Sequence, residues 1–276
     1  MTDAFKITGA TRLYAIIGDP IAQVRSPEVF TERFVAAGFN AVLLPMQVPA
    51  HHFDAVVPAL IALGNLDGLL VTIPFKARML RFASRVGESA RIVGATNALR
   101  READGTWTGD MFDGTGFVRA AERKGERLAG RNVLQFGAGG AGSAIAVALA
   151  GAGVASLRIV DPDARRAEEL VHRVRNAFPD CAAAAATASA SGVDMIVNAS
   201  PVGMRPDDGM PGDIGPLSRD TLVGDVVVTA SPTALIRHAL QHGCGYVEGR
   251  DMHGGQVDAI VDFFAPALGR AGPRVA

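Results

Sequence analysis

The feature that most constrains this chain is a glycine-rich turn between an apolar run and an alanine-rich run. Asn132–Phe136 has the composition of a buried strand and leads directly into Gly137-Ala138-Gly139-Gly140-Ala141-Gly142, after which Ser143–Ala150 is expected to form a helix. Glycines at this spacing permit a tight turn, close approach of the backbone to a pyrophosphate, and close packing of helix on strand. The helix N-terminus adds N–H groups and a positive dipole end. The pattern predicts a dinucleotide-binding loop; the alternative is a glycine turn that serves packing alone.

A carboxylate follows this loop at the distance that nucleotide recognition requires. Asp161 comes directly after a strand predicted at Leu157–Val160, about 20 residues beyond the glycines. In that position a carboxylate accepts hydrogen bonds from the ribose hydroxyls of NAD and repels the 2′-phosphate of NADP. The sequence therefore favours NAD, with NADP as the possible alternative. Arg165 and Arg166 either reach a phosphate or lie exposed on the following helix.

The charge balance argues for a small-molecule ligand. The 276 residues carry 27 Lys and Arg against 28 Asp and Glu, and 49% of them are apolar, which is enough for a packed core. A near-neutral chain is not expected to bind nucleic acid or an anionic membrane surface. The stretch Asn132–Leu157 is free of charge and longer than the roughly 20 residues of a bilayer span, but its glycines favour strand, turn and buried helix.

Metal and disulfide chemistry are not expected. Cys181 and Cys244 are the only cysteines, and the six histidines show no metal-ligand spacing. The segment Met1–Gly9 lacks the apolar core of a secretory signal, so a reducing cytoplasm is the expected location.

Apolar runs and turn residues alternate along the chain in a β-α-β pattern. This alternation predicts two α/β units in tandem, each with a parallel sheet covered by helices on both faces. A helix is expected from Ser26, with Ser26 as its N-cap, and another from His52 to Leu63, while Ala182–Ala186 is expected to be a surface segment. The further predicted strands are Leu13–Ile17, Ala41–Leu44, Gly68–Ile73, Met195–Asn198 and Asp225–Val228.

Motifs along nearly the whole chain resemble, in order and spacing, those of the shikimate/quinate dehydrogenase family. The family patterns are G-N-P-I-x-H-S-x-S-P, N-V-T-x-P-F-K, G-A-V-N-T, G-x-N-T-D-G-x-G and G-x-x-M-x-x-x-Q. Their counterparts here are Gly18–Ile21 with Ser26-Pro27, Val71–Lys76, Gly94–Asn97, Gly109–Phe117 and Gly249–Gln256, to which the glycine loop and Asn198–Met204 are added.

The resemblance implies a two-domain α/β protein. Residues 1–112 together with 249–276 would form an α/β substrate-binding domain, and residues 113–248 would form an inserted Rossmann-type NAD(P)-binding domain. The reaction would take place in the cleft between them. Besides the glycine loop and Asp161, the cofactor-binding residues implied by the motifs are Asn198, Ser200 and Met252.

Lys76 and Asp113 match the family's catalytic pair. Hydride transfer between a ring carbinol and nicotinamide requires a proton to leave or join the oxygen, and an amine poised by a carboxylate can carry that proton. The resemblance therefore implies that Lys76 is the general acid/base and that Asp113 orients it and shares the substrate hydroxyl. It also implies that four polar residues bind the substrate: Ser26, Thr72, Asn97 and Gln256.

The chain departs from the family on the substrate side. Val24 replaces the first serine of S-x-S and Val228 replaces a tyrosine, and in the family both groups hold the substrate carboxylate. Leu70 replaces the asparagine of N-V-T, and Met111-Phe112 replaces N-T. Two lost hydrogen bonds to a charged group cost roughly 3–6 kcal/mol, which is about a hundredfold to ten-thousandfold in affinity. The expected substrate is a cyclic alcohol or ketone that is less polar than shikimate or has an altered acid group.

Asp161-Pro162-Asp163 stands where NADP-using members carry N-R-T, which again favours NAD. Two other readings stay open. Arg25 and Ser26 are sufficient for the carboxylate in a true shikimate or quinate dehydrogenase, and a nucleotide-sensing protein without turnover would retain only the fold. The assembly is expected to be a monomer or a homodimer.

Overall fold

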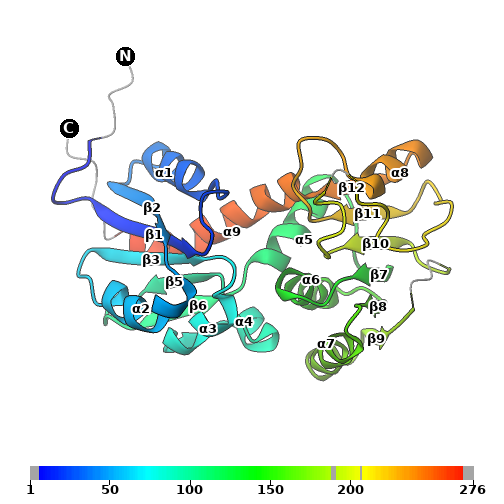
Figure 1. Ribbon diagram of the computed structural model, residues 1–276, viewed down its shortest axis with the longest axis horizontal. Helices are drawn as coiled ribbons and strands as arrows, with labels where there is room; N and C mark the ends of the chain where they lie inside the picture. The colour runs from blue at the N-terminus through cyan, green and yellow to red at the C-terminus, as the bar shows by residue number, and fades with distance from the viewer. Residues whose placement is uncertain (1–5, 188–190, 206, 270–276) are drawn as a thin grey trace, which may run out of the picture. The chain divides into compact units, whose positions relative to one another are not determined.

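The computed structural model describes residues 6–187, 191–205 and 207–269 of the chain. The chain divides into two compact units. The first unit holds the described chain up to Met111 together with the part from Val257 onward, and the second unit is Phe112–Gln256. Each unit has its own six-stranded sheet with flanking helices, so the protein has the two-domain α/β fold that the sequence predicts (Figure 1).

The sheet of the first unit is mixed. Its strand order is β2-β1-β3-β5-β6-β4, and β5 runs antiparallel to β3 and β6. The prediction of a parallel sheet is wrong for this unit, because β5 and β6 form an antiparallel hairpin beside β3. The elements are β1 (Arg12–Gly18), α1 (Ser26–Ala36), β2 (Ala41–Gln47), α2 (Phe53–Ile61), β3 (Leu66–Val71), α3 (Lys76–Met79), β4 (Arg85–Val86), α4 (Glu88–Val93), β5 (Ala98–Arg101) and β6 (Trp107–Asp110), with 3-10 turns at Ala50–His52 and Leu80–Phe82.

Alternating side chains of β1 divide the core of the first unit into two layers. Ile17 belongs to a buried cluster that also contains Phe53 and Phe75, whose rings stack 4.5 Å apart. Tyr14 faces the other way, with its ring 4.8 Å from Phe34 of α1 and 4.9 Å from Phe264. Helices therefore cover both faces of this sheet.

Helix α1 begins one residue earlier than an N-cap at Ser26 would require. Arg25 already has helical backbone angles, with φ −103° and ψ −4°, and Ser26 is the first residue of the helix. The cap position carries no side-chain hydrogen bond. The predicted N-cap role of Ser26 is therefore wrong.

The sheet of the second unit is parallel throughout. Its order, β12-β11-β10-β7-β8-β9, is the doubly wound order of dinucleotide-binding folds. The order reverses between β7 and β10, and the crevice at such a switch point is where these folds bind ligands. The elements are α5 (Asp113–Arg123), β7 (Asn132–Phe136), α6 (Gly140–Gly151), β8 (Ser156–Val160), α7 (Ala164–Ala177), β9 (Ala182–Ala185), β10 (Met195–Asn198), β11 (Leu222–Asp225), α8 (Ala234–His242) and β12 (Gly245–Glu248).

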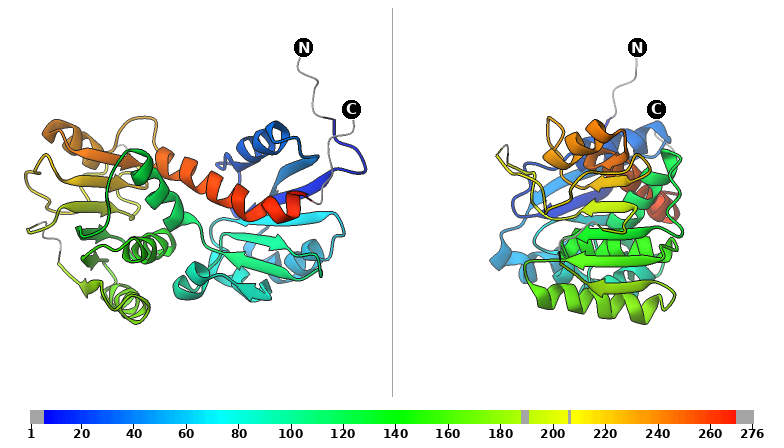
Figure 2. Two further views of the ribbon diagram at one scale, coloured as in Figure 1. Left: turned by 180° about the vertical axis from the view of Figure 1, so that it is seen from behind. Right: turned by 90° about the vertical axis from the view of Figure 1, so that its right-hand side faces the viewer.

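Two segments of the second unit differ from expectation. β11 ends at Asp225, so the strand predicted at Asp225–Val228 is displaced, because its neighbour β10 also ends there and pairs Asn198 with Asp225. The alanine run is an edge strand, β9, paired with β8, and Ala183 is buried. Helix α7 packs along this edge (Figure 2).

The last described helix, α9 (Gly249–Leu268), contributes to both units, because the division falls at Val257 within it. The predicted boundary at residue 249 lies at its first residue. Among the described helices, none combines the length and the apolar character that a bilayer span requires.

Close packing of α5 on α6 leads to a stability prediction. A Cβ at Gly114 would lie 2.1 Å from the Ala144 carbonyl oxygen, which is backbone and cannot turn away. We expect Gly114→Ala to lower the free energy of unfolding by about 1–3 kcal/mol in urea titrations. Gly254→Ala is the matched control, since no heavy atom lies within 4 Å of a Cβ there. A Gly114→Ala protein as stable as this control would contradict the packing argument.

Candidate active site

The glycine loop joins β7 to α6 at the switch point of the parallel sheet. Gly137 has φ +98°, and a Cβ there would lie 2.6 Å from the Ala199 carbonyl oxygen. A Cβ at Gly142 would lie 2.2 Å from the Gly137 carbonyl oxygen. Gly139 and Gly140 instead are exposed, with open space around a Cβ. The outer glycines thus close the turn, while the inner two leave the first N–H groups of α6 open to an anion, which fits a dinucleotide pyrophosphate.

Asp161 ties the end of β8 to this loop. Its carboxylate accepts hydrogen bonds from Ala138 N at 2.7 Å and from Asp163 N at 2.9 Å. A carboxylate has about four acceptor positions, so ribose hydroxyls can still be accepted. Asp163 caps α7 by accepting from Arg165 N, and both Arg165 and Arg166 are exposed side chains near Asp163. Two carboxylates therefore stand beside the predicted ribose position.

Asn198 is held inside the protein at the end of β10. It is fully buried; its amide donates to Val202 O at 2.8 Å and to Asp225 Oδ1 at 3.1 Å. Its oxygen accepts from Ser200 N and Oγ. Asp225 also accepts from Val227 N and, at 2.6 Å, from Thr233 Oγ1, which caps α8. This network fixes the two loops that follow β10 and β11, and a direct cofactor contact of Asn198 stays a prediction.

The buried carboxyl of Asp225 is expected to make the stability of the protein depend on pH. Burial raises the pKa of its carboxyl, and the hydrogen bonds from Thr233, Val227 and Asn198 oppose that rise. Because the pKa of Asp225 is higher in the folded protein than in the unfolded chain, its protonation adds to the free energy of unfolding. This contribution is complete below the ordinary Asp pKa of about 3.9 and is lost as the pH rises through the raised pKa. We therefore expect the free energy of unfolding of wild type, measured in urea, to fall relative to that of Asp225→Asn as the pH rises above about 4. Parallel pH curves for the two proteins would contradict this.

The predicted catalytic residue Lys76 and two predicted substrate residues, Thr72 and Asn97, are brought together by backbone hydrogen bonds. Lys76 O accepts from Thr96 N at 3.0 Å, next to Asn97, and Asn97 O accepts from Val71 N at 2.8 Å, next to Thr72. Thr72 lies at the carboxyl end of β3, where its Cγ2 fills the space beside Gly18 of β1. Asn97 is buried, whereas Thr72 and Lys76 are half-buried. Residues that carry an amine, an amide and a hydroxyl are therefore neighbours at the carboxyl end of β3.

Asp113 and Gln256 are paired in the second unit. Gln256 Nε2 donates to Asp113 Oδ1 at 2.6 Å, and Asp113 is buried at the first position of α5. Two glycines let the backbones of α5 and α9 approach closely enough for this hydrogen bond. A Cβ at Gly116 would lie 2.7 Å from Met252 O, and a Cβ at Gly255 would lie 2.3 Å from Gly116 O. The first turns of α9 therefore lie against α5, and the buried Met252 belongs to this contact (Figure 2).

The residues that replace polar residues of the family differ from one another in how far they are buried. Leu70 and Met111 are buried, Val24 is half-buried and Ser26 is 9% exposed. Arg25 lies at the surface, and its guanidinium is 2.7 Å from the carboxylate of Glu28 on the same helix end. Arg25, the alternative partner for a substrate carboxylate, is therefore already paired with a carboxylate of this chain. Leu70 is therefore a core residue of β3.

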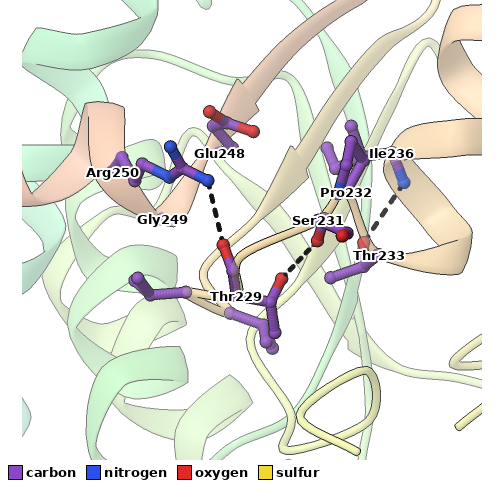
Figure 3. Close-up of a pocket in the computed structure, with 10 residues that line it drawn as sticks. Thr229, Ser231, Pro232, Thr233, Ile236, Glu248, Gly249 and Arg250 are labelled. Carbon is purple, nitrogen blue, oxygen red and sulfur yellow. Dashed lines mark hydrogen bonds between the residues drawn. The ribbon is translucent and has the colours of Figure 1, made fainter. Parts of the chain in front are cut away.

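Val228 is 64% exposed and lines a surface pocket at the carboxyl ends of β11 and β12. Arg250 reaches across this pocket and donates to Thr229 O at 3.0 Å, which holds the loop that carries Val228 (Figure 3). Glu248 lies beside it. Neither charged residue was predicted, since Arg250 is at an x position of G-x-x-M-x-x-x-Q and Glu248 comes just before that motif. In the described chain, no group of three or more His, Cys, Asp or Glu side chains is arranged to hold a metal ion.

Comparison with known proteins decides the family. A shikimate dehydrogenase (NADP(+)) from Rubrobacter xylanophilus is 38% identical over 254 residues, which cover 90% of this chain and 88% of that protein. The chain belongs to the shikimate/quinate dehydrogenase family. It is an oxidoreductase of that type, and members of the family use NAD or NADP. The family model described as the shikimate dehydrogenase substrate binding domain matches residues 16–99, within the first unit.

Solved structures of the family share the fold. Shikimate 5-dehydrogenase from Listeria monocytogenes, in complex with shikimate and NAD, has a TM-score of 0.88 at 29% identity and covers 94% of this chain and 93% of its own. The 5-ketofructose reductase of a Gluconobacter strain has a TM-score of 0.83 at 27% identity and covers 94% of this chain and 96% of its own.

Proposed function

We propose that this protein is an NAD-linked dehydrogenase of the shikimate/quinate type whose substrate is a cyclic alcohol or ketone that is less polar than shikimate or has an altered acid group. The observation that carries the proposal is a contrast. The predicted proton-transfer residues Lys76 and Asp113 are retained with ordered partners, while the positions that hold the acid group in the family are apolar at Val24 and Val228.

Lys76 is the general acid/base in this proposal. Its place beside Thr96 and near Asn97 and Thr72 lets an amine exchange a proton with a substrate oxygen that the neighbouring polar groups hold. Asp113, kept in one orientation by Gln256, accepts a hydrogen bond from the same hydroxyl. When bound, the nicotinamide supplies or accepts the hydride. The first unit thus serves as the substrate domain and the second as the nucleotide domain.

The substrate side supports a change of acid recognition. Ser26 is the remaining hydroxyl of the family's S-x-S pair, and Arg25 is already paired with Glu28. Loss of two donors to a carboxylate corresponds to roughly 3–6 kcal/mol, enough to shift preference toward a neutral analogue. The Gluconobacter relative is named for 5-ketofructose, a ketose without a carboxylate, which supports the view that this fold accommodates such a substrate.

The nucleotide side supports NAD. Asp161 and Asp163 place two carboxylates after β8, and Pro162 offers no cation for a 2′-phosphate. The Listeria enzyme was solved with NAD, whereas the Rubrobacter relative is named for NADP(+). The preference of this chain therefore rests on its own residues.

A true shikimate or quinate dehydrogenase is the second candidate, favoured by the 38% identity to a relative of that name and by the retained Ser26. A nucleotide-sensing protein without turnover is the third, and the retention of Lys76 with Asp113 argues against it.

A dehydrogenase screen separates the three candidates. Shikimate, quinate, aminoshikimate and less hydroxylated cyclohexane and cyclohexene alcohols would be tested with NAD and with NADP, following absorbance of the reduced cofactor. We expect NAD-dependent turnover that favours a compound other than shikimate and quinate. Ordinary family efficiency with either acid would overturn the altered substrate, and NAD binding without any turnover would favour the sensor.

A further inference from the structure

A glutamine in the central strand of the second unit is in an unusual position. Gln135 belongs to β7, between Leu134 and Phe136, and its side chain is completely buried. Its Nε2 donates to the carbonyl oxygen of Gly137 and to that of Gly142, each at 2.9 Å. These carbonyls belong to the start of the glycine loop and to the first turn of α6. One side chain therefore bridges the two ends of the loop.

The other end of the same amide has no partner. Gln135 Oε1 is buried without a hydrogen bond to any part of the chain that the structure describes. Buried polar atoms in that condition are rare, and each one calls for an explanation in terms of what the group achieves. An apolar side chain would avoid this unfavourable burial. The bridge to Gly137 and Gly142 is what glutamine adds at this position.

The bridge acts where the loop has little freedom. The Gly142 backbone lies so close to Gly137 O that a Cβ at Gly142 would be 2.2 Å from that oxygen. Ala138, the residue after Gly137, donates its N–H to the Asp161 carboxylate. Gln135 therefore fixes the two peptide planes on either side of the open positions Gly139 and Gly140. The direction of the first N–H groups of α6, which would face a pyrophosphate, depends on those planes.

We propose that Gln135 is a positioning residue that holds the glycine loop in the geometry required for the pyrophosphate of the nicotinamide cofactor. The inference rests on the NAD(P)-binding part of the proposed function and is independent of the substrate. The side chain acts from beneath the loop and does not touch the cofactor.

The test uses Gln135→Met, which keeps the length of the side chain and removes both donors, and Leu134→Val as the control. Leu134 is equally buried on the same strand but belongs to the core cluster of the opposite face. For Gln135→Met we expect the Kd for NADH in fluorescence titration and the KM for NAD to rise about tenfold, or about 1.4 kcal/mol. The KM for the alcohol substrate and kcat at saturating NAD should stay near wild type. Leu134→Val should lower the melting temperature and leave the Kd unchanged.

Gln135→Glu supplies a second readout. The protonated acid can donate one hydrogen bond to the loop, whereas the ionised carboxylate would face two carbonyl oxygens. The Kd of this variant should therefore increase as the pH rises, while that of wild type does not follow the same curve. Wild-type affinity in Gln135→Met, or a parallel loss in Leu134→Val, would overturn the inference. A wild-type protein that binds neither NAD nor NADP would instead overturn the proposed function.

Discussion

Lys76→Met is expected to lower kcat by roughly a hundredfold to ten-thousandfold, the range that a positioned general acid/base contributes. The side chain is half-buried at the start of α3, and methionine keeps most of its apolar stem. Binding of NADH should stay near wild type, because the glycine loop lies in the other unit. Steady-state kinetics together with a fluorescence titration of NADH measure both quantities.

Lys124→Met is the matched control. Lys124 is an exposed lysine of the second unit whose ammonium pairs with Asp251 and donates to Tyr246 O at 3.0 Å. Its loss is expected to reduce stability slightly and to leave kcat within a few-fold of wild type. Retained turnover in Lys76→Met, or an equal loss in both variants, would contradict the assignment of Lys76 as the proton donor.

Asp161→Ala is expected to change the ratio of kcat/KM for NAD to that for NADP by about a hundredfold in favour of NADP. Hydrogen bonds to a charged group contribute roughly 1.5–3 kcal/mol, and the repulsion of a 2′-phosphate disappears with the carboxylate. Kinetics with both cofactors at a fixed substrate concentration measure the ratio.

Asp161→Asn separates the two tasks of this residue. An amide oxygen can still accept from Ala138 N, so the loop stays anchored while the charge is removed. Glu168→Gln, an exposed charge deletion on α7, is the control and should leave the ratio unchanged. A wild-type preference for NADP, or an unchanged ratio in Asp161→Ala, would contradict the NAD assignment.

The fold of the second unit could be predicted where an element is defined by its own residues. β7 and β10 were expected within their observed bounds, since each is a short apolar run followed by a turn. The bounds of β11 were not predicted correctly, because its end is set by pairing with β10 and by Asp225, whose carboxylate accepts a hydrogen bond from Val227 N. An apolar run that continues past the last paired residue carries no sign of that limit.

The hairpin of the first unit was missed for a different reason. β5 and β6 are only four residues each, and β5 ends in two arginines while β6 has a single apolar residue, Trp107, so hydrophobic periodicity marks neither strand. The turn signal Asp104-Gly105 was present, with Gly105 at φ +82°. Turn chemistry would have located this hairpin where hydrophobic periodicity did not.

Some residues of the candidate site could likewise be predicted from the sequence and others could not. The glycine loop and Asp161 could be predicted because their chemistry is local and their spacing is fixed by one β-α-β unit. The networks around Asn198 with Asp225 and around Gln135 join residues through side-chain contacts that no spacing reveals. A glutamine between Leu134 and Phe136 was nevertheless visible as a polar break in an apolar strand.

We propose that this protein has lost acid recognition while it retains hydride transfer with NAD. The most direct test of this proposal compares kcat/KM with NAD for shikimate and for shikimate methyl ester, two compounds that differ at the acid group alone. Because Val24 and Val228 offer the carboxylate no hydrogen bond through their side chains, the two values are expected to lie within about tenfold of each other. A preference for shikimate of about a hundredfold or more would mean that the carboxylate is bound strongly and would contradict the account.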